Sequence, residues 1–593
     1  MTEPVLGVAR SLGGRRWVWR GGEDRTADRA SLGIAQRLEL PEIVGRLLAA
    51  RGIGIEAAAD FLDPTLRALM PDPSRLTDMD IAAERLARAA KAGETIGVFG
   101  DYDVDGACSS ALIVTLMRDL GCTVVHHVPD RMLEGYGPNA PALASLVARG
   151  AAVVVCVDCG TAAADVLATL NGRADAIVLD HHKADGVTPP ILATVNPNRL
   201  DDRSGLNTLC AAGVAFMTAV ATVRALRKQG FFAQRPEPNL MALLDLVALA
   251  TVCDVMPLVG LNRALVCQGL KVMTRRSRPG IAALLEVTQA RETLSAFTCG
   301  FALGPRINAA GRISEADLGL RLLLSVDPLE ARALATRLDG VNRQRQEVEA
   351  TMLDAALEAA QRQAEAGCAV LVVAGPDWHP GVVGIVAGRI KEKFNRPACV
   401  AGIAGGLAKG SARSVPGIDL GAAVIAARQA GILATGGGHP MAAGFSLPES
   451  NIAAFHAFLN ERLSDAALLP GSADLAIEGT LAVGGATTDL ARQVERLAPF
   501  GAGNEEPLLV LHRARVLRAD RVGREANTIR AYVEGEDGGQ RLKAMMFRAK
   551  DGPIADALLN RDRPPLHMAG HLRAEEWNGS VTPGFFISDA ALA

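Results

Sequence analysis

Acidic and imidazole side chains follow apolar runs at four places in this sequence. The first is Asp101-Tyr102-Asp103-Val104-Asp105, after the stretch 95–99; the others are Asp158, Asp180-His181-His182 and Asp254. Mixed carboxylate and imidazole ligands suit manganese or magnesium better than calcium. Two such cations about 3.5–4 Å apart need a bridging acid, lower the pKa of a bridging water and stabilise charge on a phosphoryl group. The pattern therefore predicts a two-metal site for phosphoester hydrolysis.

The segments around these acids predict an α/β domain that positions them. Short buried strands alternate with helical stretches, which is typical of a mainly parallel sheet with helices on both faces. In such sheets, ligand groups gather at the carboxyl ends of the strands. We expect strands at 95–99, 122–128, 151–157 and 176–179, and helices at 81–92 and 109–120.

Other interpretations of the acidic residues are weaker. A calcium loop starting at Asp101 would need a bidentate glutamate at its twelfth position, which is Leu112. Cys156 and Cys159 form a CxxC pair, but no second pair follows at zinc-ligand spacing, so we interpret them as buried thiols beside Asp158. A chance acidic surface turn would not place an acid after several separate apolar strands.

The composition and the pattern of apolar residues divide the rest of the chain into further segments. Residues 1–75 are an N-terminal extension that we expect to pack on the α/β domain, residues 76–325. Residues 326–366 predict one long connecting helix, or two helices broken at Gly340. A smaller glycine-dense α/β unit follows at 367–465. Alternating strands at 466–593 predict a small β-barrel. The apolar stretch 241–261 contains Asp245 and Asp254, so it predicts a buried helix and not a membrane span.

The ordered motifs resemble the DHH phosphoesterase family, and within it the bacterial single-strand DNA exonucleases. The resemblance covers about residues 75–590 and implies a DHH domain, a DHH-associated domain and an OB-fold. The motifs that carry it begin with the four acidic segments, Gly100–Gly106, Val157–Gly160, Asp180–His182 and Ala250–Val255. They continue with Pro129–Arg131, Glu134–Gly137, Gly304–Arg312, His379–Ile385, Gly410–Ser414, Gly436–Gly444 and Pro499–Asn504.

Carried over residue by residue, the resemblance implies a metal-ligand set of Asp103, Asp105, Asp158, His181 and Asp254. Asp158 would bridge two divalent cations, Mn²⁺ or Mg²⁺, and His182 would contact the scissile phosphate. Many members have a histidine where this sequence has Phe99, so Asp101 is a candidate to act in its place.

The resemblance also implies phosphate and DNA contacts, and guanidinium groups fit phosphate oxygens well. The expected contacts are Arg131, Arg306, Asn308, Arg312, Ser411, Arg413 and His439. Aromatic residues make up only 4 % of the chain. The candidates for base stacking are Tyr136, Tyr532 and Trp577, whereas for Phe547 core packing is the favoured interpretation.

The implied function is 5′→3′ hydrolysis of single-stranded DNA to 5′-mononucleotides in DNA repair and recombination. Two alternatives stay open: a DHH-type oligoribonuclease or small-nucleotide phosphodiesterase, and an inactive DHH scaffold that binds DNA. The formal net charge of -3 requires any positive field to be local. Scattered cysteines and the lack of a signal-peptide pattern favour a cytoplasmic protein. We expect a monomer with no membrane association, and a RecQ-type helicase and a single-strand-binding protein are candidate partners.

Overall fold

The computed structural model describes residues 1–593 except 1–2, 23–24, 185, 291–292, 468–473, 537, 561, 563 and 578. The chain forms two compact units, which are described separately. One unit contains residues 71–256 and 268–470. The other contains residues 1–70, 257–267 and 471–593.

The first unit begins with a five-stranded parallel sheet of order β3-β2-β4-β5-β6. Four of its strands are the four predicted from apolar runs. All but β3 are almost wholly buried, as expected for strands covered on both faces. The strands are β2 (Ile96–Gly100), β3 (Val124–His127), β4 (Val153–Val157), β5 (Asp175–Leu179) and β6 (Ala193–Val195).

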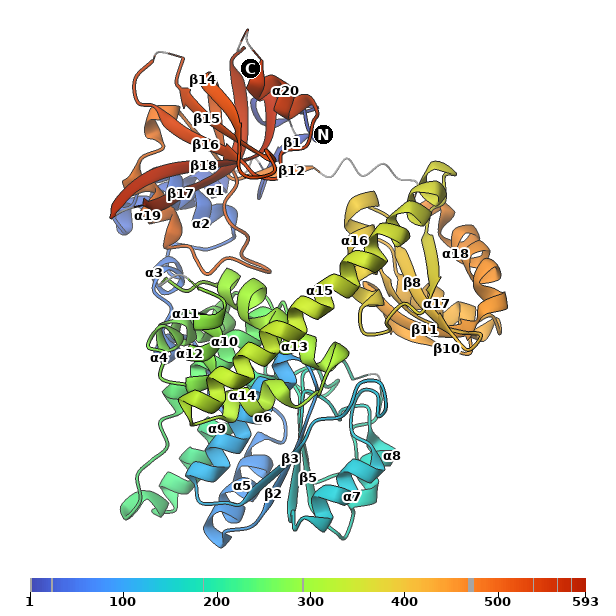
Figure 1. Ribbon diagram of the computed structural model, residues 1–593. Helices are drawn as coiled ribbons and strands as arrows, with labels where there is room; N and C mark the ends of the chain where they lie inside the picture. The colour runs from blue at the N-terminus through green and yellow to red at the C-terminus, as the bar shows by residue number, and fades with distance from the viewer. Residues whose placement is uncertain are drawn as a thin grey trace. The chain divides into compact units, whose positions relative to one another are not determined.

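Helices cover both faces of this sheet, as the alternation of elements predicted (Figure 1). Phe99, on β2, packs with the helices of one face among Leu143, Leu146 and Cys156. That face carries α7 (Ala140–Ala148) and α8 (Ala164–Leu167). The other face carries α5 (Met79–Ala92), α6 (Val104–Asp119) and α9 (Ala211–Lys228).

A group of helices follows the sheet. The buried α10 (Leu244–Cys253) ends next to Asp254, as predicted for the apolar stretch there. None of the helices in the described ranges is long and apolar enough to cross a membrane. The group continues with α12 (Pro279–Val287), the π-helix η6 (Thr298–Leu303), α13 (Gly304–Ile313) and α14 (Leu318–Leu324). The helix α11 (Gly260–Thr274) has residues in both units.

The predicted connecting helix is α15 (Pro328–Glu365), a single helix of 38 residues. Gly340 does not break it. At 1.5 Å per residue it is about 57 Å long. One part packs against α12, α13 and α14, and another against the second α/β domain.

That second domain has a mixed sheet of order β10-β11-β9-β8-β7, in which only β7 and β8 are parallel. Its strands are β7 (Leu371–Pro376), β8 (Ala398–Ala404), β9 (Leu407–Arg413), β10 (Thr435–His439) and β11 (Ala442–Pro448). Its helices are α16 (Val383–Phe394), α17 (Leu420–Gln429) and α18 (Ile452–Ala467).

The other unit is built on a β-domain of order β13-β14-β15-β16-β18-β17, with β14 also paired to β17. Its elements are β12 (Leu475–Ile477), β13 (Gly479–Leu481), α19 (Thr488–Glu495), β14 (Leu509–Val522), β15 (Thr528–Glu534), β16 (Leu542–Met546), α20 (Pro553–Leu559), β17 (Leu566–Trp577) and β18 (Ser580–Leu592).

The N-terminal segment shares the core of this β-domain. We expected it to pack on the α/β domain that follows it in sequence. Instead, Val44, Leu47 and Leu48 pack in one cluster with residues of β14 and β17. Trp17 is fully buried, pairs with Leu475 in a parallel bridge, and donates from Nε1 to Asp589. The segment comprises β1 (Trp17–Trp19), α1 (Arg25–Arg37), α2 (Glu42–Ala50), α3 (Ala58–Leu62) and α4 (Leu66–Leu69).

Arg263 contacts two other stretches of the unit that contains residues 1–70, 257–267 and 471–593. Its guanidinium is buried and donates to Phe61 O, Leu497 O and Ala498 O, each at 2.8 Å. It also lies 3.9 Å from the centroid of the Phe61 ring. These carbonyls lie in separate parts of the chain, so one cation satisfies buried acceptors that water cannot reach.

We expect Arg263→Ala to destabilise this unit by about 3 kcal/mol or more, because several buried carbonyls lose their donor. The stability of Arg263→Lys should lie between that of the wild type and that of Arg263→Ala, since an ammonium group cannot reach all of the same acceptors. Calorimetry of the full chain measures the change. Arg492→Ala, at an exposed position on α19, is the matched control. Equal unfolding profiles for Arg263→Ala and Arg492→Ala would contradict this role.

Candidate metal centre and phosphate pocket

The first acidic motif lies in the turn between β2 and α6. Asp103 is the N-cap of α6, and its Oδ1 accepts from Gly106 N at 3.0 Å. Asp101 and Asp105 are buried on either side of it. Two glycines permit this tight turn. A Cβ on Gly100 would lie 1.9 Å from Ser110 Oγ, and one on Gly106 would lie 2.3 Å from Asp101 O.

Asp105 is fixed by the start of another helix. Its Oδ2 accepts from Ala211 N at 2.7 Å and its Oδ1 from Ala212 N at 2.8 Å, at the N-terminus of α9. The partial positive charge there favours a carboxylate. Ser109 Oγ donates to the same group. Asp105 is therefore held in one orientation without being neutralised by a basic side chain.

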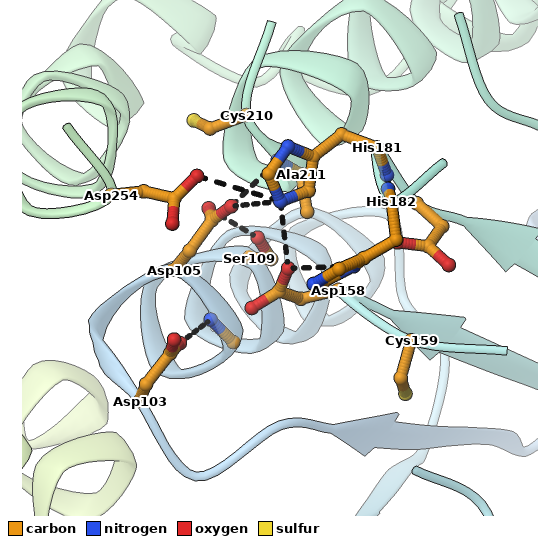
Figure 2. A network of polar contacts seen from close by, with 12 residues as sticks. Asp103, Asp105, Ser109, Asp158, Cys159, His181, His182, Cys210, Ala211 and Asp254 are labelled. Carbon is orange, nitrogen blue, oxygen red and sulfur yellow. Dashed lines mark hydrogen bonds and ion pairs between the residues drawn. The ribbon is translucent and has the colours of Figure 1, made fainter. Parts of the chain in front are cut away.

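Three carboxylates converge on His181. Its Nε2 lies 3.3 Å from Asp158 Oδ1, 3.5 Å from Asp254 Oδ2 and 3.7 Å from Asp105 Oδ2 (Figure 2). Asp158 has a φ of 59°, a left-handed conformation that is uncommon for aspartate. Such backbone strain occurs where a site demands a particular side-chain direction.

Asp180 positions the histidines. Its carboxylate accepts from His181 N, His182 N, Thr161 N and His182 Nδ1, the last at 2.8 Å. Burial lowers the pKa of His182, but the hydrogen bond and charge of Asp180 overcome that effect and raise it to about 9. Tyr136 Oη lies 3.2 Å from His182 Nδ1 and 3.1 Å from Asp158 O, to which it donates.

Sequence reasoning missed two asparagines that complete this framework. Asn196 donates to Thr161 Oγ1 at 2.8 Å and to His182 O at 2.9 Å. Asn198 donates to His181 O at 2.6 Å. Asn196 directly follows β6, and Asn198 lies two residues further on. The signal that found the acids, a polar residue at the end of a buried strand, also points to Asn196, although β6 was not among the predicted strands.

The cluster carries more negative charge than its surroundings compensate. Burial and the neighbouring carboxylates raise the pKa of Asp101 and of Asp158 well above the usual range. Burial, with the charges of Asp105 and Asp103, raises the pKa of Asp254 to about 8. A bound cation would remove this repulsion, which is why buried carboxylates of this kind usually pair or coordinate metals.

The donor atoms fit divalent cations. Among the described residues, Asp101 Oδ1 and Asp158 Oδ1 are buried and accept no hydrogen bond. Three groups of ligand atoms lie within 4.8 Å of one another. They are Asp101, Asp103 and Asp158; Asp105, His181 and Asp254; and Asp158, His181 and His182. Asp158 belongs to two of the groups, as does His181. Phe99 stacks on His127 inside the core and offers no ligand.

Arginines lie beside the acids. A cavity of about 320 Å³ is lined by Asp101, Tyr102, Asp103, Arg131, Cys253, Asn308 and Arg312. Asn308 Oδ1 accepts from Val104 N, and Arg131 lies over the Tyr102 ring. Burial, together with the charges of Arg131, Arg345 and Arg413, lowers the pKa of Arg312 to about 10. The cavity therefore joins the acidic cluster to a positive one.

The second α/β domain adds to this positive cluster. Arg312 Nη1 donates to Gly381 O at 2.9 Å, which ties α13 to the turn before α16. Burial and the charge of Arg131 lower the pKa of Arg413. Ser411 and Arg413 both border Gly384. Arg131, Arg312 and Arg413 form no ion pair with an acid in the described part of the chain, so their charge is available to a ligand.

His439 and Arg306 are placed differently from the other predicted contacts. His439 is opposite Ala442, which is opposite Arg413, so the side chains share one sheet face about 10 Å apart. Arg306 does not line the cavity. It pairs with Asp339 at 2.9 Å and donates to Ala302 O.

The aromatic residues considered for base stacking differ in their exposure and surroundings. Tyr136 is exposed beside His182, and Tyr532 lines a cavity of about 730 Å³ on the β-domain with Arg518, Arg541 and Lys543. The preference for core packing of Phe547 is wrong, because its ring is 57 % exposed and stacks on Phe586. The Trp577 side chain lies outside the described residues.

Three family models match the chain. The DHH family N-terminal domain matches residues 95–251, the DHHA1 domain residues 366–465, and the RecJ OB domain residues 477–589. Each match falls on one of the sheets described above. Together they reproduce the domain sequence implied by the motifs.

Curated relatives and solved structures match most of the chain. The single-stranded-DNA-specific exonuclease RecJ of Escherichia coli is 38 % identical over 524 residues, which cover 86 % of this chain and 89 % of that protein. The RecJ of Bacillus subtilis is 33 % identical over 574 residues, 94 % of this chain and 69 % of that protein. The crystal structure of RecJ in complex with Mn²⁺ from Thermus thermophilus aligns with a TM-score of 0.80 at 30 % identity. It covers 97 % of this chain and 79 % of that one.

We expect Asp158→Asn to raise the stability of the metal-free protein and to abolish its stabilisation by manganese. Because the pKa of Asp158 is raised in the folded protein, its carboxyl costs stability as the pH rises above the ordinary carboxyl pKa, at about 1.4 kcal/mol per pH unit until the raised pKa is reached. Wild-type protein should gain roughly 2.7 kcal/mol when free Mn²⁺ exceeds its Kd a hundredfold. Thermal unfolding in EDTA and then in Mn²⁺ measures both effects.

Asp119→Asn is the matched control, because Asp119 is exposed at the far end of the same helix, α6. It should keep the full response to manganese. A normal manganese response in Asp158→Asn would show that Asp158 is not a shared ligand.

Proposed function

Because this chain belongs to the RecJ family of DHH phosphoesterases, we propose that its carboxylate–imidazole cluster hydrolyses the terminal phosphodiester of single-stranded DNA. The protein is a metal-dependent exodeoxyribonuclease that acts from the 5′ end and releases 5′-mononucleotides in DNA repair and recombination. The observation that carries the residue assignment is the acidic cluster that opens into an arginine-lined cavity.

The proposed ligands are Asp103, Asp105, Asp158, His181 and Asp254. Asp101 supplies a further oxygen in place of the histidine that Phe99 replaces, since its buried Oδ1 has no hydrogen-bond donor among the described residues. Asp158 would be the ligand shared by two cations, because it belongs to two of the donor groups and its carboxylate has two oxygens, whereas the Nε2 of His181 can bind only one cation. When bound, two cations lower the pKa of a water between them and stabilise charge on the phosphoryl oxygens.

His182 stabilises the reacting phosphate in this proposal. Asp180 fixes its Nδ1 and favours the imidazolium, so its Nε2 can donate to a phosphate oxygen. Such preorganised donors act most strongly where charge develops in the transition state. The Tyr136 hydroxyl also lies within hydrogen-bond distance of this ring and helps to keep it in place.

The arginines determine polarity. Arg131, Arg312 and Arg413, with Ser411, bind a terminal 5′-phosphate, and Asn308 closes the same cavity. His439 extends this face of the sheet. Guanidinium groups without acidic partners suit a dianionic phosphate better than the single charge of an internal phosphodiester. A strand is therefore engaged at its 5′ end, with the first internal phosphodiester beside the acidic cluster.

We also propose that the protein is a cytoplasmic monomer that receives single strands from a RecQ-type helicase and a single-strand-binding protein. The need for an unpaired substrate supports a helicase, and the family resemblance supports both partners. Sedimentation of the purified chain and degradation of duplex with and without each partner would test this.

Digestion of single strands labelled at either end, with and without Mn²⁺, tests the function. From a 5′-labelled strand, the label should be released at once as a mononucleotide. A 3′-labelled strand should instead shorten progressively. Duplex DNA should resist, and Asp158→Ala should be inactive. Cleavage confined to very short RNA or dinucleotides would favour a small-nucleotide phosphodiesterase. Binding without metal-dependent cleavage would favour a scaffold.

We expect Arg413→Ala to lower kcat/KM for 5′-phosphorylated strands roughly 10- to 100-fold, the loss of a charge-assisted hydrogen bond. The effect should be much smaller for strands with a 5′-hydroxyl, so the variant loses the preference for 5′-phosphorylated over 5′-hydroxyl strands. Arg428→Ala, an exposed arginine on α17 of the same domain, is the control. An equal loss on both substrates would contradict a 5′-phosphate contact.

A further inference from the structure

Two exposed phenylalanines form a stacked pair near the acidic cluster. The rings of Phe297 and Phe301 lie 4.7 Å apart between centroids, with an interplanar angle of 21°. They are 68 % and 70 % exposed, the largest values among the described aromatic side chains. An isolated exposed ring needs no explanation, but a stacked pair of rings that is mostly exposed offers a surface on which another flat group can stack.

The segment that carries them is fixed to the metal centre. Phe301 lies in η6, which runs directly into α13. Cys253 Sγ donates to Cys299 O at 3.4 Å, and a Cβ on Gly304 would lie 2.4 Å from Cys253 Sγ. Cys253 precedes Asp254 and lines the arginine cavity. A π-helical turn in such a place is common at functional sites.

Spacing and charge favour a nucleic-acid strand as the occupant. Asn308, at the cavity, is seven residues beyond Phe301, which is about 10 Å along a helix. Consecutive stacked nucleotides are about 3.4 Å apart, so this distance corresponds to roughly three nucleotides. Arg306 donates to Ala302 O beside the rings, and its acid, Asp339, is shared with Arg343. Two arginines for one carboxylate leave the local charge positive.

We propose that Phe297 and Phe301 form a base-stacking shelf for single-stranded DNA, about three nucleotides from the cavity that holds its 5′ end. Arg343, whose side chain is exposed, faces the phosphates that pass there. The inference deepens the proposed function and rests on it. Stacking on a ring tolerates any base but requires an unpaired one. The shelf therefore selects for single strands at a point outside the reaction centre.

The test compares Phe297→Ala/Phe301→Ala with a matched double variant, Phe231→Ala/Phe232→Ala. Phe231 and Phe232 also contact each other, but they follow the C-terminus of α9, whose N-terminus holds Asp105. The 18 residues of α9 separate them from the site by about 27 Å. Both variants are made in the full chain and checked for unchanged thermal unfolding.

Binding is measured in EDTA with 5′-phosphorylated strands that carry one 2-aminopurine, moved through the first eight positions. Wild-type protein should change the fluorescence most about three to five nucleotides from the 5′ end. The Phe297→Ala/Phe301→Ala variant should lose that signal and bind about tenfold more weakly or worse, as expected for a lost stacking contact. The Phe231→Ala/Phe232→Ala variant should match the wild type.

Digestion in Mn²⁺ then distinguishes a role in strand binding from a role in the chemical step. The shelf variant should show a raised KM for long strands of any sequence, a kcat within about twofold of wild type, and a defect that shrinks as strands are shortened. Unchanged binding and fluorescence in the shelf variant overturn the proposal, and so does a lowered melting temperature with unchanged fluorescence. Wild-type binding without cleavage would instead contradict the proposed function and leave the shelf intact.

Discussion

Repulsion among buried carboxylates is the constraint on which the rest of the structure depends. Asp101, Asp105 and Asp158 are almost inaccessible to solvent and close to one another. Folding must place them there without neutralising them, since a lysine or arginine among them would occupy the metal positions. The chain uses backbone amides instead. The start of α9 holds Asp105, and the start of α6 is capped by Asp103. Amides orient a carboxylate while leaving it charged.

The sequence predicted this arrangement well because each acid terminates a separate apolar run. Apolar strands of five residues can be buried only inside a covered sheet, and parallel strands end at one edge. Asp158 and Asp180 therefore had to lie near the first acidic turn. The same reasoning predicted α10 and its terminal Asp254. The positioning role of Asp180 was not visible in the sequence, because it depends on the hydrogen bonds that its carboxylate accepts from His181 N, His182 N and His182 Nδ1.

Predictions failed where long-range packing decides. The N-terminal segment joins the core of the β-domain at the other end of the chain, and no local pattern encodes a partner more than 400 residues away. Phe547 follows a strand and looks apolar, but its side chain lies on the exposed face. In each case a distant residue or the strand register sets the outcome, and neither is local in sequence.

One helix relates the two charge clusters to each other. On α13, Asn308 contacts the first acidic turn, Gly311 lies against Tyr102, and Arg312 reaches both the cavity and Gly381. A Cβ on Gly311 would lie 2.7 Å from Tyr102 O, and one on Gly381 2.4 Å from Arg312 O. These close backbone contacts therefore fix the distance between the acidic cluster and Arg312. In an enzyme that grips a terminal phosphate and cuts at a metal centre, that separation sets product length. Under the proposed site assignment, the fixed separation set by α13 would lead to release of single nucleotides and not of a mixture of lengths.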